Sequence, residues 1–325
     1  MPKAPLISII IPVYNVENYL SLAIDSVLSQ NIEKMEVIAI NDGSTDASKN
    51  ILQNYQDNDS RVTGLHQENR GLSAVRNRGL KCAKGKYIYF FDSDDVLKPG
   101  ALEKVITRLE ATESEIACFS VNMIDEAGSL RTENNEKIEK GLEITLPVKG
   151  GDFLQKVFYA GKYGAIVQKY VFHRQFLYNH QLLFDEGYIH EDEAFMIESL
   201  CQAGKVVSFE EVLLLKRSRP GSIMSTQRSE KNVKGWVKAA SRMLQFLENT
   251  SFSDATETVI KKKASQLILI SLYNIQKINK RSTSKLSLYD YIDRDELRKL
   301  GFTFYLKIKF NLLYKAYYKM KSLFA

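Results

Sequence analysis

The chain has few cysteines and no long hydrophobic run. Its 325 residues include three cysteines, Cys82, Cys118 and Cys201, and no C-x-x-C pair. This usage predicts neither a structural zinc site nor a disulfide framework, and it favours a reducing, cytoplasmic setting. No stretch reaches the roughly 18 apolar residues that a membrane-spanning helix needs. The apolar run from Leu6 to Val13 is too short to span a bilayer and lacks a cleavage site, so it predicts a strand.

The composition also excludes a disordered chain, because 44% of the residues are hydrophobic and 26% are charged. The charge is unevenly distributed. Residues 221–325 contain 20 Lys and Arg against 8 Asp and Glu, whereas residues 1–220 contain 25 against 31. A basic C-terminal part on an acidic body indicates an anionic partner, for which a membrane surface and nucleic acid are the two candidates.

Strands and helices alternate over the first 125 residues. Apolar stretches expected to form strands cover residues 6–13, 35–40, 62–66, 87–91 and 116–124. Amphipathic helices are expected between them, over about 46–56 and 72–83 and after Asn15 and Pro99, with Asn15 as a cap. This alternation predicts an α/β fold, with a mostly parallel sheet covered by helices on both faces. Ligands of such sheets bind at the carboxyl ends of the strands.

The later part of the chain differs in pattern. Residues 126–150 are polar and predict a surface excursion, and residues 151–219 predict mixed structure with a strand over about 206–216. From about residue 228 the pattern is helical, most clearly over 229–248 and 256–280. We therefore expect two domains, residues 1–226 and a helical, basic region over residues 227–325.

An acidic cluster follows the aromatic strand at residues 87–91. Asp92, Asp94 and Asp95 fall within four residues and repel one another unless a cation lies between them. Carboxylate oxygens in a turn suit Mg²⁺ or Mn²⁺, and such an ion can carry a diphosphate. The alternative is a solvated turn that caps the next helix. The position at a strand end favours the metal site.

Two more segments at strand ends carry polar groups. Asp42 and Gly43 form a tight turn, which leaves Asp42 to accept a proton from a base or a ribose while Asp46 caps the next helix. Gly71 precedes a helix and leaves backbone N–H groups open to a phosphate, with Arg76 one turn further on.

Glu191 and Asp192 begin a predicted helix. Acidic residues at a helix N-terminus are favourable for the dipole, and the residues alone favour this capping role. The alternative is a general base, since a partly desolvated carboxylate near other acids can accept a hydroxyl proton.

Together these segments resemble the family-2 glycosyltransferases, whose catalytic domain has the GT-A fold. The resemblance covers roughly residues 6–225 and is carried by six ordered motifs: Ile9–Asn15, Asn41–Asp46, Asn69–Asn77, Asp92–Asp95, His190–Glu193 and Arg219–Met224. It implies transfer of a sugar, with inversion, from a UDP-sugar to a hydroxyl of a saccharide or lipid-linked oligosaccharide in bacterial capsule or exopolysaccharide synthesis. Rivals from other classes are a nucleotidyltransferase and a sugar-nucleotide-binding scaffold without turnover.

The resemblance also implies roles for single residues. The residues implied for the nucleotide-sugar site are Pro12, Tyr14, Asn15 and Glu17 around the nucleoside, Asp42 on the uracil, Arg76 near the ribose or diphosphate, and Ser93 within the D-x-D motif. Asp94 and Asp92 would hold Mn²⁺ or Mg²⁺. Asp192 would be the base, supported by Glu191. Arg217 or Arg219 would close over the diphosphate, although the family often has an aromatic residue near there.

Residues 302–325 contain no acidic residue and combine an apolar stripe with lysines on the opposite side. This basic amphipathic helix is expected to lie on the inner face of the cell membrane, which would make the enzyme a peripheral one. The alternative is a helix packed on the body or on a second copy in a homodimer. No nucleic-acid-binding motif accompanies the charge, so nucleic acid is not expected as a partner.

Overall fold

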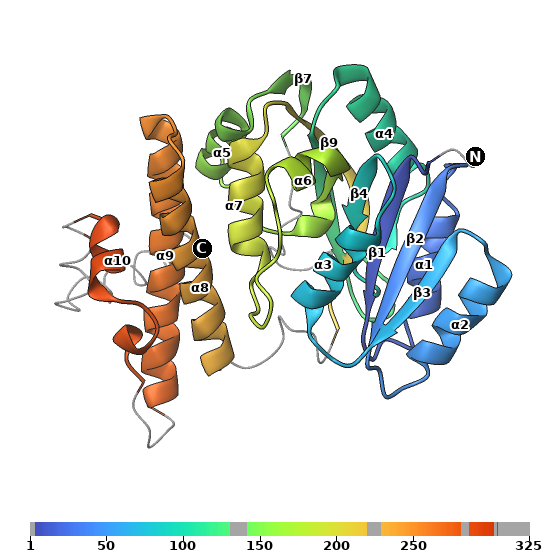
Figure 1. Cartoon of the computed structure of the whole chain (residues 1–325), viewed down its shortest axis with the longest axis horizontal. Helices are drawn as coiled ribbons and strands as arrows, with labels where there is room; N and C mark the ends of the chain where they lie inside the picture. The colour runs from blue at the N-terminus through green and yellow to red at the C-terminus, as the bar shows by residue number, and fades with distance from the viewer. Residues whose placement is uncertain (1–3, 131–141, 220–228, 281–285, 302–303, 305–325) are drawn as a thin grey trace. The chain divides into compact units, whose positions relative to one another are not determined.

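The computed structural model describes residues 4–130, 142–219, 229–280, 286–301 and 304 (Figure 1). The chain divides into two compact units. The first contains Met1–Gly187 and Phe195–Ser225, and the second contains Tyr188–Ala194 and Thr226–Ala325. The short segment Tyr188–Ala194 therefore belongs with the C-terminal helices, although it lies in the middle of the chain.

The first unit is built on a sheet with strand order β3-β2-β1-β4-β8-β6-β9-β5. Its parallel half contains β1 (Ile7–Val13), β2 (Met35–Asp42), β3 (Val62–Gln67) and β4 (Tyr87–Phe90). β1, β2 and β4 are almost wholly buried, as expected where helices cover both faces, whereas β3 at the edge of the sheet has only Val62 buried. The predicted α/β class and the four strands are confirmed.

The other half of the sheet is mixed. β6 (Ile116–Ile124) runs parallel to β9 (Val206–Arg217), and β8 (Tyr170–His173) lies antiparallel between β4 and β6. β5 (Val96–Leu97) and β7 (Ile144–Val148) both pair antiparallel with β9. The sequence predicts β6 and β9 but not β8, because four residues are too few to show a period.

Helices cover both faces of the sheet (Figure 1). On one face, the odd-numbered side chains of β1 join a core with α1 (Leu20–Leu28) and α4 (Ala101–Thr112). On the other face, α3 (Leu72–Cys82) lies so close to β1 that a Cβ on Gly79 would be 2.3 Å from Cγ2 of Ile10. A glycine at this position is therefore required for the approach of the helix that carries Arg76.

The expected helix cap at Asn15 is wrong. α1 begins at Leu20 with Tyr19 as its N-cap, and Asn15 has a φ of +50°. The side chain of Asn15 instead accepts a hydrogen bond from the backbone N–H of Thr45, at 2.8 Å. The N-cap of the following helix, α2 (Ser48–Asn58), is Ala47 rather than Asp46, and Asp46 instead accepts from the backbone N–H of Ser48 at 3.0 Å from the position before the cap.

The remaining elements of the first unit are short helices around β7 and β8. They are α5 (Gly150–Tyr159), η1 (Val167–Lys169) and α6 (Arg174–Asn179). A further helix, α7 (Asp192–Gln202), begins in the second unit and continues into the first. Phe195 of α7 packs edge-on against Phe90 of β4, with ring centroids 6.1 Å apart.

The second unit is dominated by two long helices, α8 (Glu230–Asn249) and α9 (Asp254–Asn279), which pack along each other (Figure 1). Both helices were expected from the sequence and are confirmed. The short elements η3 (Leu288–Asp290) and α10 (Arg294–Lys299) follow. Across the described part of the chain, no helix is both long and apolar enough to cross a membrane. The amphipathic helix expected over residues 302–325 lies outside the described residues, except for Phe304.

Candidate active site

Three carboxylates meet directly after β4. One oxygen from each of Asp92, Asp94 and Asp95 lies within 4.8 Å of the others. The backbone N–H of Asp95 donates to the carbonyl of Asp92 at 3.2 Å, which folds the segment into a tight turn. The Asp95 side chain is fully buried, and the other two are partly buried. So dense a group of negative charges in a low-dielectric place requires cations nearby.

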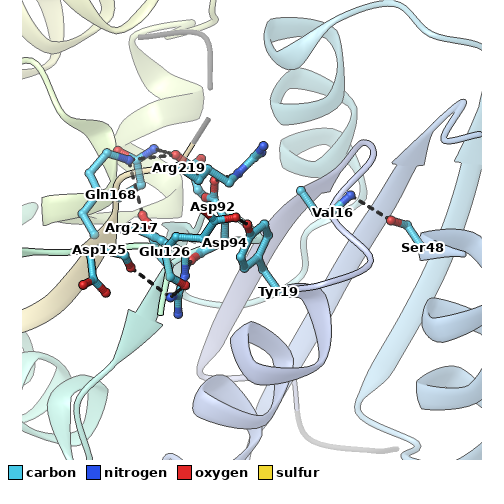
Figure 2. A network of polar contacts seen from close by, with 12 residues as sticks. Val16, Tyr19, Ser48, Asp92, Asp94, Asp125, Glu126, Gln168, Arg217 and Arg219 are labelled. Atoms are coloured by element: carbon cyan, nitrogen blue, oxygen red, sulfur yellow. Dashed lines mark hydrogen bonds and ion pairs between the residues drawn. The ribbon is translucent and has the colours of Figure 1, made fainter. Parts of the chain in front are cut away.

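Two cationic side chains and one amide supply this compensation at Asp92. Lys216, near the end of β9, places Nζ 3.2 Å from Oδ2 of Asp92 and 3.3 Å from Oδ2 of Asp95. Arg76, which is buried in α3, places Nη2 3.1 Å from Oδ1 of Asp92. The amide of Gln168 in η1 donates to Asp92 as well (Figure 2). The three nitrogen donors come from different elements, β9, α3 and η1, so the fold fixes their relative placement.

Burial and the neighbouring charges shift the pKa values of Asp92 and Asp95 in opposite directions. Burial acts to raise the pKa of Asp92, but Lys216 and Arg76 outweigh it and hold the pKa below its ordinary value. Burial raises the pKa of Asp95, and its neighbours Asp94 and Asp92 raise it further against the effect of Lys216. Burial lowers the pKa of Lys216, but the carboxylates outweigh this and raise it, so Lys216 is cationic here.

Asp94 has a different environment from its two neighbours. Arg219 places Nε 2.6 Å from Oδ2 of Asp94, while Arg217 donates from Nε to the backbone carbonyl of Asp94 at 3.0 Å. Both guanidinium groups lie over the ring of Tyr19, at 5.5 and 5.3 Å from its centroid. Figure 2 shows Tyr19 beside Asp94, and the hydroxyl of Tyr19 donates a hydrogen bond to Oε1 of Glu126 at 2.9 Å.

The oxygens of Asp92, Asp94 and Asp95 together make a possible site for a hard divalent cation. Oxygen ligands of this kind suit Mg²⁺ or Mn²⁺. The Oδ1 of Asp95 accepts the backbone N–H of Arg217 at 2.9 Å and its Oδ2 faces Lys216, while Asp92 pairs with both Arg76 and Lys216. Asp94 is bound on its side chain by Arg219 among the described residues, and it is 15% exposed. Ser93, between Asp92 and Asp94, is buried.

A second polar group lies at the end of β2. Asp42 is buried, and its Oδ1 accepts hydrogen bonds from Nε2 of Gln67 at 2.7 Å and from the backbone N–H of Arg70 at 2.9 Å. Its Oδ2 accepts from the backbone N–H of Gly71 at 2.8 Å. A carboxylate offers about four acceptor positions, so among the described residues Oδ2 keeps one for a further donor.

The residues after β1 line the same edge of the sheet. Tyr14 is 48% exposed, and Pro12 on β1 is half-buried. Asn15 and Glu17 are tied to the loop before α2: the N–H of Asn15 donates to Ser44 at 3.1 Å, and the carboxylate of Glu17 accepts from the N–H of Ala47 at 2.7 Å. The hydrogen bonds of Asn15 and Glu17 therefore fix the loop that carries Tyr14.

The expected base lies in the second unit. Asp192 is the first residue of α7 and is half-buried, and Glu191 before it is buried. The structure thus groups the acidic cluster, Asp42 and Tyr14 in one unit, and Glu191 and Asp192 with the C-terminal helices. Of the sixth motif, residues 220–224 lie outside the described residues, whereas Arg219 is described.

Sequence reasoning missed Gln168. It lies on a short segment whose position against the acidic cluster follows from β8, and β8 itself has no clear pattern in the sequence. The backbone carbonyl of Gln168 accepts from the buried hydroxyl of Tyr89 at 2.8 Å. Tyr89 belongs to the aromatic strand before the cluster. A tyrosine hydroxyl in a buried strand needs a hydrogen-bond partner, and this need was the signal in the sequence that a polar group lies next to the strand.

Comparisons with known proteins agree with this arrangement. Residues 8–176 match the model of the family described as glycosyl transferase family 2. The uncharacterized glycosyltransferase EpsJ of Bacillus subtilis (strain 168) is 32% identical over 67% of this chain and 63% of its own length. The succinoglycan biosynthesis protein ExoO of Rhizobium meliloti (strain 1021) is 30% identical over 70% of this chain and 64% of its own. The chain thus spans less than two thirds of either relative.

Among solved structures, S. aureus TarS 1–349 in complex with UDP-GlcNAc superposes with a TM-score of 0.69. The match covers 92% of this chain and 82% of that chain, at 17% identity. Likeness at this level of identity concerns the fold, which is of the GT-A type in both.

Proposed function

This chain belongs to glycosyl transferase family 2, and we propose that it moves a sugar from a UDP-sugar to a hydroxyl of a saccharide or lipid-linked oligosaccharide. One observation carries the proposal: buried carboxylates compensated by cations lie at the carboxyl ends of parallel strands, where α/β sheets bind nucleotides. The likeness to TarS, crystallised with UDP-GlcNAc, supports a UDP-sugar donor. The name of ExoO supports a place in polysaccharide synthesis.

The nucleoside half of the donor would bind at the ends of β1 and β2. The exposed ring of Tyr14 offers a face to a base, with Pro12 beside it on β1. The remaining acceptor position on Oδ2 of Asp42 suits a uracil N–H. Asn15 and Glu17 would act through the loop that they fix.

The diphosphate would lie at the acidic cluster. Mn²⁺ or Mg²⁺ held by Asp94 and Asp92 would neutralise the charge of the departing diphosphate. Arg76 holds Asp92, and Ser93 sets the spacing of the two acids. Arg219 would exchange its bond to Asp94 for one to the diphosphate, because a guanidinium binds phosphate oxygens as well as it binds a carboxylate.

The acceptor hydroxyl would lose its proton to Asp192, with Glu191 in support. Inversion needs attack from the side opposite the leaving diphosphate, so the base must come from elsewhere than the acidic cluster. Asp192 is separate from that cluster in the sequence. Residues 1–226 would thus form the catalytic domain. Within the helical region 227–325, residues 302–325 would bind a membrane surface or, alternatively, a second copy.

A panel of UDP-sugars tests the proposal, with detection of UDP. Water can replace the acceptor in a slow hydrolysis, so the assay needs no known acceptor. Release of UDP from one donor supports a glycosyltransferase, whereas release of pyrophosphate in a parallel assay with UTP and sugar 1-phosphates would identify a nucleotidyltransferase instead. Binding of UDP without turnover of any donor would indicate a sugar-nucleotide-binding scaffold. Replacement of Asp192 by Asn should abolish transfer and leave UDP affinity unchanged.

A further inference from the structure

The segment that carries the proposed base is stacked on the only tryptophan of the chain. The rings of His190 and Trp236 lie nearly parallel, with an interplanar angle of 13° and centroids 4.4 Å apart. His190 directly precedes Glu191 and Asp192, and Trp236 lies on α8. Both belong to the second unit.

A hydrogen bond fixes the imidazole in its plane. Asn232 of α8 places Nδ2 3.1 Å from Nε2 of His190. The backbone N–H of Ser229 donates to Oδ1 of Asn232 at 3.0 Å, so the amide nitrogen is the end that faces the ring. An amide nitrogen can only donate, and Nε2 of His190 must therefore accept, which makes this histidine neutral with its proton on Nδ1.

The backbone around His190 is held in a conformation that it would not choose by itself. His190 has a φ of +65°, which is uncommon for any residue with a side chain. Next to it, Ile189 lies so close to α8 that a Cβ on Gly235 would be 2.1 Å from the carbonyl oxygen of Ile189. On the other side, Lys263 of α9 pairs with Glu193 at 2.8 Å, and both side chains are largely buried.

We propose that Trp236 is a positioning residue, whose stacking on His190 fixes the turn that aims Asp192 at the acceptor hydroxyl. The inference rests on the proposed function, in which Asp192 is the base. A residue with positive φ keeps its conformation only where its surroundings impose it. The indole face, the Asn232 amide and Gly235 impose it here. A displacement of about 1 Å in such a group can cost about 100-fold in rate.

The test compares two substitutions of Trp236 in the full chain. Trp236→Phe keeps a ring that can stack on His190, whereas Trp236→Leu keeps an apolar side chain without a ring. We expect Trp236→Leu to lower the kcat of UDP release from the UDP-sugar at least tenfold. The KM for the UDP-sugar and the affinity for UDP should stay unchanged within twofold. Trp236→Phe should restore most of kcat. This split follows because the base acts on the acceptor, while the donor binds the first unit.

Phe246→Leu on the same helix provides the control. It removes an aromatic pair with Phe252, whose centroid is 5.0 Å away, and should lower stability without lowering kcat. If Trp236→Leu has the kcat of Phe246→Leu, or if Trp236→Phe is as slow as Trp236→Leu, the inference is overturned. Asp192→Asn separates the two claims: if that variant keeps transfer, the base assignment itself is wrong.

Discussion

Arg219 places Nε 2.6 Å from Oδ2 of Asp94, so the acid that we assign to the metal is ion-paired with the arginine that we assign to the diphosphate. Both side chains are less than one fifth exposed. A metal could replace Arg219 as the partner of Asp94, and a diphosphate could replace Asp94 as the partner of Arg219. Binding of donor and of metal should therefore reinforce each other.

Replacement of Asp94 by Asn should weaken metal binding. The change removes the charge of the acid that pairs with Arg219 and keeps its shape. We expect the affinity for Mn²⁺ in the presence of UDP to fall at least tenfold, measured by electron paramagnetic resonance titration. Asp59→Asn, which breaks an ion pair with Arg61 beyond α2, is the control and should bind Mn²⁺ like the unmodified chain. Equal affinities of the two variants would remove Asp94 from the metal site.

Replacement of Lys216 by Met should destabilise the fold. It leaves Asp92 and Asp95 without their shared cation in a buried place, and breaking such a pair costs about 3 kcal/mol. Lys104→Met is matched, because Lys104 pairs with Glu211 at 2.6 Å but both side chains are about half exposed. That pair is worth less than about 1 kcal/mol. Urea unfolding measures the stability of both variants, and equal midpoints for Lys216→Met and Lys104→Met would contradict the role of Lys216.

Replacement of Asp42 by Asn should weaken nucleotide binding without any metal. One carboxylate oxygen becomes an amide nitrogen, which cannot accept from Gly71, Arg70 or Gln67 and repels the donor that it meets. We expect the affinity for UDP in EDTA to fall about tenfold, by calorimetric titration, for the loss of one or two hydrogen bonds to a charged group. Asp57→Asn on the exposed face of α2 is the control and should leave the UDP affinity unchanged. A normal UDP affinity for Asp42→Asn would mean that the uracil does not bind at Asp42.

Acid should destabilise the second unit through His190. Burial, together with the smaller effect of the charge of Lys263, lowers the pKa of His190 to about 4 from its ordinary 6.5. The unfolded chain takes up a proton near pH 6.5 and the folded chain near pH 4, so stability is complete above pH 6.5 and is lost as the pH falls toward 4. The full shift corresponds to about 3 kcal/mol, and partial exposure of the ring reduces the expected loss to about 2 kcal/mol.

The fluorescence of Trp236, the only tryptophan, follows this loss directly. The free energy of urea unfolding, read from its emission, should fall between pH 6.5 and 4. In His190→Gln the amide cannot titrate, and this part of the pH dependence should disappear. A slope that is the same in both proteins would assign the acid effect to groups other than His190.

The sequence predicts the buried strands and the long helices, because their hydrophobic patterns are regular. β1, β2 and β4 are continuous apolar runs because both faces of each strand are covered, and α8 and α9 show long helical periods. The acidic cluster is also visible, because three carboxylates directly follow a buried strand.

The contacts that complete the site depend on long-range pairing, which no local pattern reports. Gln168 reaches Asp92 only because β8 enters the sheet between β4 and β6. Lys216 is visible as a basic residue near a strand end, but its two ion pairs follow from where β9 lies. The stack of Trp236 on His190 joins residues 46 positions apart, in a unit to which the intervening residues 195–225 do not belong.

We propose that this chain releases UDP from a UDP-sugar with the help of a divalent cation at Asp94 and Asp92. The most direct measurement is UDP release across a donor panel, first with Mn²⁺ or Mg²⁺, then after EDTA, and then after the ion is restored. We expect release from one donor, loss of most of it in EDTA, and recovery with the metal. UDP release that is unaffected by EDTA would contradict the metal site, and absence of both UDP release and UDP binding would contradict the nucleotide site itself.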